Sequence, residues 1–100
     1  MKALLINPVE KVIEAIDVKD MNEIIKLIGY ESVIADEVGE HGDNLYFDEE
    51  CFLRGSEGRF QIDSLIPVSG IGVITGSSEN GEIADMQTSQ SELQARIKFL

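Results

Sequence analysis

The stretch ALLINPVEKVIEAIDV, residues 3–18, decides how the chain begins and how its sheet is built. Ala3–Ile6 is a continuous apolar run, which is typical of a central strand covered on both faces. Beyond this run the pattern allows two structures. Asn7-Pro8 suits the start of a helix, and four apolar residues follow at helical spacing: Val9, Val12, Ile13 and Ile16. The β-branched residues over 12–18, with Asn7-Pro8 as a turn, instead favour a hairpin.

The next segment is a clearer helix. Asp20 stands at the capping position, Glu23 completes a capping box, and Gly29 follows the last helical residue. Between them, apolar residues repeat at i, i+3, i+4 and i+7: Met21, Ile24, Ile25 and Ile28. The sequence therefore predicts an amphipathic helix over 20–28 that packs on a sheet.

Strands are predicted along most of the remaining chain. The alternating or β-branched runs are Glu31–Val38, Leu45–Phe47, Phe60–Ile62, Ile71–Thr75 and Glu82–Met86. The first two are expected to pair as a hairpin, and the last two to pair around Asn80-Gly81, the strongest hairpin-turn signal in the chain. Glycines in and beside the strand 71–75 allow another backbone or a bulky side chain to come close.

A final helix opens with the capping box Ser89–Glu92 and places Leu93, Ile97 and Leu100 on one face. The apolar C-terminus is therefore expected to dock on the chain's own sheet, with a homodimer as the alternative. Together the elements predict the α+β class, with a single mixed or antiparallel sheet of about five to seven strands and two packed helices. They form one domain over residues 1–100.

Charge and composition exclude several classes of function. The 100 residues include 8 Lys and Arg against 19 Asp and Glu, a formal net charge of −11. That balance argues against direct nucleic-acid binding, which relies on Lys and Arg. Cys51 is the single cysteine, which rules out an intrachain disulfide and a multi-cysteine zinc site. Since the sequence has no membrane span or signal peptide, we expect a cytoplasmic protein without membrane contact.

The acidity is concentrated in residues 31–57, which hold nine acids against Arg54 alone. Repulsion within this segment costs stability. One interpretation is a solvated surface that aids solubility, and the other is a recognition surface for a partner with a basic surface. The second interpretation predicts an interaction surface of seven acids: Asp36, Glu37, Glu40, Asp43, Asp48, Glu49 and Glu50.

Few residues are candidates for chemistry. Arg54 and Arg59 flank a Gly/Ser/Glu turn, where their guanidinium groups could hold an anion or only neutralise the surrounding acids. His41 lies in an acidic loop without the spacing of a metal site, and Cys51 has no base beside it in sequence. The glycines of Gly70–Gly76 lie in a strand that feeds a turn, unlike a nucleotide-binding loop. We therefore expect no catalytic residue, no metal and no cofactor.

Several segments spread over nearly the whole chain carry a family resemblance: Met1–Pro8, Ile24–Gly29, Asp43–Glu50, the pattern of Pro67, Gly70, Val73 and Gly76, and Ser91–Leu100. On these segments the chain resembles a small family of uncharacterised proteins, a domain of unknown function common in phages, plasmids and their bacterial hosts. The resemblance implies a mobile-element setting and a strand–turn–strand opening, so we predict a strand over Val12–Asp17. It implies no catalytic residue.

These observations predict a non-enzymatic accessory protein of a phage or plasmid that binds a host protein through an acidic face at residues 31–57. Its sharpest form is a DNA-mimic inhibitor of a nucleic-acid enzyme, in which carboxylates stand for phosphates. The alternative is a small module that binds an anion or a nucleotide at Arg54 and Arg59. In either case we expect a monomer or a homodimer.

Overall fold

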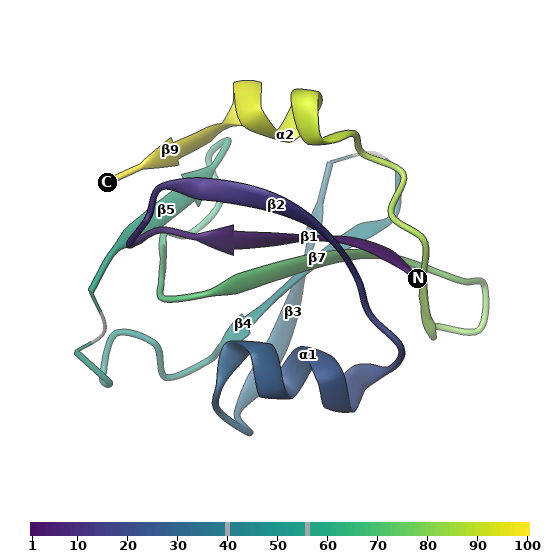
Figure 1. Ribbon diagram of the computed structural model, residues 1–100, viewed down its shortest axis with the longest axis horizontal. Coiled ribbons are helices and arrows are strands. Elements are labelled where there is room, and N and C mark those ends of the chain that lie inside the picture. The colour runs from purple at the N-terminus through teal and green to yellow at the C-terminus, as the bar shows by residue number, and fades with distance from the viewer. Residues whose placement is uncertain (40, 56) are drawn as a thin grey trace.

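The structure is a computed structural model that describes residues 1–39, 41–55 and 57–100. In chain order its elements are β1 (Lys2–Asn7), β2 (Val12–Asp17), α1 (Met21–Ile28), β3 (Val33–Val38), β4 (Asp43–Asp48), β5 (Arg59–Ile62), β6 (Val68–Ser69), β7 (Gly72–Ser77), β8 (Ile83–Ala84), α2 (Gln90–Arg96) and β9 (Ile97–Phe99). The main sheet has the order β2-β1-β7-β4-β3 (Figure 1). β8 pairs with β7, and a second sheet has the order β6-β5-β9. Every strand pair of the described residues is antiparallel. The predicted α+β class is confirmed.

β1 and β2 form an antiparallel hairpin. Of the two structures that the sequence allows after Ile6, a helix and a hairpin, the hairpin forms. The Asn7 side chain turns the chain back instead of capping a helix. Its Oδ1 atom accepts the N–H groups of Val9 at 3.1 Å and Glu10 at 3.2 Å. The strand predicted over Val12–Asp17 is confirmed.

Helix α1 forms as its capping pattern predicts. The Asp20 carboxylate accepts the Glu23 N–H at 3.1 Å, and Gly29 ends the helix in the left-handed conformation with φ 93°. Ile24 and Ile28 are buried in a cluster on one face of the main sheet. Neither helix of the described residues has the length and apolar content needed to cross a membrane.

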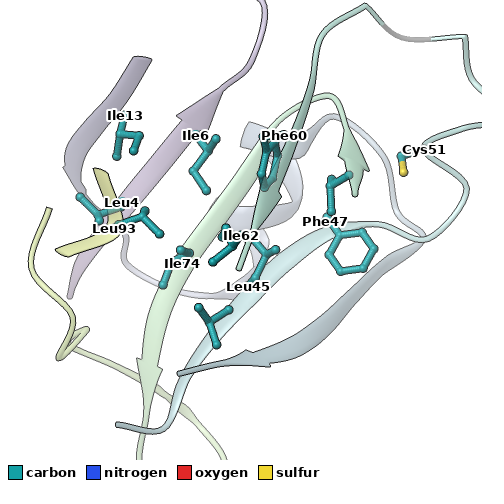
Figure 2. Packing of buried hydrophobic residues seen from close by; sticks show 12 residues of the cluster. Leu4, Ile6, Ile13, Leu45, Phe47, Cys51, Phe60, Ile62, Ile74 and Leu93 are labelled. Carbon is teal, nitrogen blue, oxygen red and sulfur yellow. The ribbon is translucent and has the colours of Figure 1, made fainter. Parts of the chain in front are cut away.

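β7 is the central strand, between β1 and β4, and its alternating side chains enter two separate cores. Ile74 belongs to a cluster with Leu45, Phe60 and Leu93, which lies between the two sheets and α2 (Figure 2). Val73 belongs to the cluster that packs against α1. The main sheet is therefore covered on one face by the second sheet and α2, and on the other by α1 (Figure 1).

Two glycines of β7 provide the close approaches predicted from the sequence. A Cβ atom at Gly72 would lie 2.7 Å from Cζ of Phe60, and one at Gly76 would lie 2.1 Å from the carbonyl oxygen of Asp85. Gly72 thus makes room for the second sheet, and Gly76 for the chain that follows β8. Any larger residue would have to displace these neighbours.

The second sheet departs from the prediction of a single sheet. Phe60–Ile62 forms a strand as expected, but it pairs with β6 and β9 and lies over the main sheet. Phe60 is fully buried there, so pairing in a separate layer gives this aromatic ring a core on the face opposite α1. The hairpin around Asn80-Gly81 forms, although its second strand is only Ile83–Ala84.

The C-terminal helix is shorter than predicted. It begins at its Ser89 cap but ends at Arg96, and Ile97–Phe99 continues as strand β9 beside β5. The free edge of β5 offers backbone partners to these residues, whose β-branched and aromatic side chains suit a strand. The expected helical face therefore stops at Leu93, and Leu100 is exposed. The terminus docks on the chain's own sheet, but as a strand.

Gly76→Ala is expected to lower the free energy of unfolding by about 3 kcal/mol or more, because its Cβ atom would overlap the backbone oxygen of Asp85. Urea unfolding measures this loss. Gly81→Ala is the control, since Gly81 has φ 80° and no atom of the described residues lies within 4 Å of an added Cβ. It therefore reports backbone strain alone, about 1–2 kcal/mol. Equal losses in the two variants would contradict the crowding at Gly76.

Removal of Phe99 and Leu100 tests how the terminus docks. Phe99 pairs with Phe60, and the Leu100 N–H donates to the Arg59 carbonyl at 2.9 Å. We expect the shortened chain to unfold about 1–3 kcal/mol more easily, because apolar burial and strand hydrogen bonds are lost. Its mass by light scattering should not change. A shift from dimer to monomer would show that the terminus holds a second copy instead.

Candidate functional site

The seven acids predicted as one interaction surface do not share one surface. Asp43 and Asp48 are 0% and 4% exposed, so the prediction is wrong for both of them. Glu40 lies outside the described residues. The remaining acids are at least partly exposed: Asp36, Glu37, Glu49 and Glu50.

Asp43 is buried because it joins two distant segments. Its carboxylate oxygens accept the backbone N–H groups of Gln87 at 2.8 Å and Thr88 at 2.7 Å. These amides replace the water that a carboxylate loses on burial. Asp43 therefore fixes the link between β8 and α2 to the start of β4.

Asp48, at the end of β4, is the centre of a polar cluster. Its Oδ1 atom accepts the Ser32 hydroxyl at 2.5 Å and the Glu50 N–H at 3.1 Å, and its Oδ2 atom accepts Arg54 Nε at 3.1 Å. Burial alone raises the pKa of Asp48, but the hydrogen bonds from Ser32, Arg54 and Glu50 outweigh it. The pKa is held below its ordinary value, so Asp48 is charged at neutral pH.

Arg54 is fully engaged in this cluster. Besides Asp48, its Nη2 atom lies 3.3 Å from Glu50 Oε2 and donates to Ser32 Oγ at 3.2 Å. Its guanidinium carbon lies 4.1 Å from the centroid of the Tyr30 ring, a cation–π arrangement. An anion approaching Arg54 would meet a cation that two carboxylates already neutralise.

Arg59 lies apart from this cluster and stacks on a different ring, with its guanidinium carbon 5.2 Å from the centroid of Phe52. An open pocket of about 660 Å³ lies beside Arg54, with Lys26 and Tyr30 in its walls, and its described lining does not include Arg59. The structure therefore does not bring the two arginines together around one pocket.

Sequence reasoning missed the aromatic partners of the arginines. Tyr30 follows the C-terminal cap of α1 and Phe52 lies in the turn after β4, and both rings are exposed. An aromatic residue seven positions before Arg59, across the turns between β4 and β5, was the available signal for Phe52. No such signal links Tyr30 to Arg54, because the fold alone brings them together.

What the exposed acids share is the strand β3, which ends the main sheet. Asp36 and Glu37 are successive residues of this strand, so they point to opposite faces of the sheet. Glu49 follows β4 directly and lies beside the start of β3, where its N–H donates to the Ser32 carbonyl at 2.7 Å. We call the exposed and partly exposed acids on and beside this strand the acidic edge: Glu31, Asp36, Glu37, Glu49 and Glu50. The acidic segment is thus an edge and not a face.

The acidic edge has few cations. Within the described residues Glu50 pairs with Arg54, and no ion pair reaches the other four carboxylates. The remaining ion pair of the described chain joins Arg96 to Asp63, outside this edge. Among the described residues, the edge therefore carries four carboxylates without an ion pair, of which Asp36 is partly exposed and the other three are exposed.

His41 and Cys51 do not form a site. They lie beyond opposite ends of β4, a strand of six residues that spans roughly 17 Å. Cys51 is buried, and its Sγ atom accepts the Ser69 N–H at 3.5 Å. Nowhere in the described chain do three or more His, Cys, Asp or Glu side chains gather in a way that could hold a metal ion.

Comparison of the chain with protein-family models, with curated protein sequences and with solved structures finds no match. The resemblance to a family of uncharacterised proteins common in phages and plasmids therefore stays a prediction. The acidic edge is the candidate functional site on which a function can be inferred.

Asp48→Asn is expected to lower the free energy of unfolding by about 1–3 kcal/mol at neutral pH, because it removes the charged acceptor of Ser32 and Arg54. The pKa of Asp48 is lower in the folded chain than in the unfolded chain, so this contribution is present above about pH 4 and is lost as the pH falls through the folded pKa. Urea unfolding of the wild type and the variant across this range measures the difference.

Glu49→Gln is the control for this experiment. Glu49 is exposed and has no ion pair within the described residues, so its replacement should change stability by less than about 0.5 kcal/mol. A difference between wild type and Asp48→Asn that stays constant below pH 4 would contradict the role of the charged carboxylate.

Proposed function

We propose that this chain is a non-enzymatic accessory protein of a phage or plasmid, and that it binds a host protein with a basic surface through the acidic edge. The observation that carries the proposal is the set of four edge carboxylates without an ion pair in the described residues. Unpaired like charges lower the stability of a small domain, and the cations of a partner would offset that repulsion.

The shape of the charged region also supports this proposal. Its acids flank an edge strand and point to both faces of the sheet, so a partner can surround them. Charges of one sign that are gathered on one region of a surface increase the association rate with an oppositely charged protein and make that rate sensitive to salt. The buried Asp43 and Asp48 hold the two ends of β4, beside which the charged strand lies.

A DNA-mimic inhibitor is the sharpest form of this proposal. The exposed carboxylates would occupy a site on a nucleic-acid enzyme that otherwise takes phosphates. Such a partner places the protein in the cytoplasm of the host. Competition between this protein and duplex DNA for the same partner is the property that separates a mimic from another acidic ligand.

The alternative function, an anion or nucleotide module at Arg54 and Arg59, has weaker support. Arg54 is already hydrogen-bonded to Asp48 and paired with Glu50, and the described lining of its pocket does not include Arg59. A ligand anion would have to displace carboxylates of the chain itself.

A charge-neutralised variant tests the proposed function. The partner is captured from host lysate at low salt, purified, and its affinity for the protein measured by calorimetry. We expect Asp36→Asn, Glu37→Gln and Glu49→Gln together to weaken binding about tenfold or more, and added salt to weaken the wild-type complex. The matched control carries the same loss of charge on β2, the opposite edge of the sheet, and in the turn before it: Glu10→Gln, Glu14→Gln and Asp17→Asn, all exposed residues.

The control variant should keep its affinity within about twofold, since it differs from the edge variant only in where the charge is lost. Equal losses in both variants would show that net charge acts instead of the acidic edge. An affinity indifferent to both salt and the edge variant would overturn the proposal. Competition by duplex DNA in the same assay would identify the DNA-mimic form.

A further inference from the structure

β3 has a row of backbone groups that no other strand of the described chain takes up. The strand ends the main sheet and pairs with β4 on one side. The Glu49 N–H donates to the Ser32 carbonyl, and backbone groups alternate along an antiparallel strand. The N–H and C=O groups of Val33, Ala35 and Glu37 therefore point away from β4, and they have no hydrogen bond to the described residues.

The other edges of the two sheets are shorter or partly covered. β2 is as long as β3, but α2 lies against it and the Gln90 side chain donates to the outward Ile13 carbonyl at 2.8 Å. The edge strands of the second sheet, β6 and β9, have two and three residues. β3 is thus the longest uncovered edge in the described structure, and an edge of this kind can pair with another strand.

Charge indicates what such a strand would be. Asp36 and Glu37 place carboxylates on both faces of β3, and a second copy of this chain would bring its own carboxylates beside them. Like charges in neighbouring strands repel, which disfavours pairing between two copies. A segment rich in Lys or Arg would instead meet acids on both faces, while the exposed Ile34 and Ala35 offer apolar contacts to its remaining side chains.

We propose that the β3 edge takes up an extended basic segment of the partner protein as an additional strand of the main sheet. This inference rests on the proposed function and adds its mode of recognition. Hydrogen bonds to Val33, Ala35 and Glu37 supply affinity, and the acidic edge selects Lys and Arg at the side-chain positions. Recognition then depends on an extended backbone and not only on charge.

The test uses two capped peptides of about ten residues, long enough to cover the strand. The first alternates Lys and Thr, and the second is identical but methylated on its backbone nitrogens. Both carry the same charge, and only the first can donate strand hydrogen bonds. We expect the first to bind at least about tenfold more tightly by calorimetry, and the backbone amides of Val33, Ala35 and Glu37 to gain protection from hydrogen exchange in its complex.

Variants of the protein give an independent measurement. Ala35→Pro removes an outward N–H on β3, and proline is tolerated where an edge N–H faces solvent. The matched control is Ala15→Pro on β2. Met1 and Val18 form a hydrogen-bonded pair across β1 and β2, and backbone groups alternate along the strand, so the Ala15 N–H points away from β1. We expect Ala35→Pro to weaken binding of the Lys-Thr peptide about tenfold and Ala15→Pro to leave it within about twofold.

The outcomes separate this inference from the proposed function. If the two peptides bind equally well, and if both lose binding when Asp36, Glu37 and Glu49 are replaced by their amides, strand addition is overturned and charge recognition stands. Binding unaffected by that neutral variant would overturn both. A dimer by light scattering that Ala35→Pro converts to monomer would show that a second copy occupies the edge, and would also overturn the inference.

Discussion

The contact between the Phe60 ring and the bare backbone of Gly72 joins the two sheets, and the rest of the structure depends on it. Because Gly72 has no side chain, the second sheet can approach the centre of the main sheet, where Phe60 is fully buried. The same core includes Leu93, so α2 is held by the layer that this contact brings into place. Packing at this density leaves little tolerance for added volume.

Much of the fold follows from local signals. The α1 helix could be predicted because its cap, apolar spacing and terminal glycine all agree, and the strands around Asn80-Gly81 because that pair strongly favours a turn. The C-terminal strand could not, since Ile97 continues the helical spacing of Leu93 and only the unpaired edge of β5 converts it to a strand. Local sequence pattern predicts the type of an element unless a strand distant in sequence pairs with the same residues.

The candidate site was predictable in part. A concentration of acids over residues 31–57 is visible in the sequence, and it predicts four of the exposed members: Asp36, Glu37, Glu49 and Glu50. The burial of Asp43 and Asp48 was not, because their partners at Gln87, Thr88 and Ser32 are far away along the chain. Buried and exposed carboxylates cannot be distinguished by residue type in a sequence. The hydrogen bonds of the folded chain distinguish them.

The central position of β7 has a consequence for synthesis of the protein. β7 pairs with β1 on one side and β4 on the other, although it is made long after both. The hairpins β1–β2 and β3–β4 can each close from neighbouring residues as they leave the ribosome, but they cannot join each other until residue 75 follows. During that interval each hairpin has a temporary edge whose backbone groups have no strand partner, which is the kind of surface that chaperones shield and that aggregation exploits.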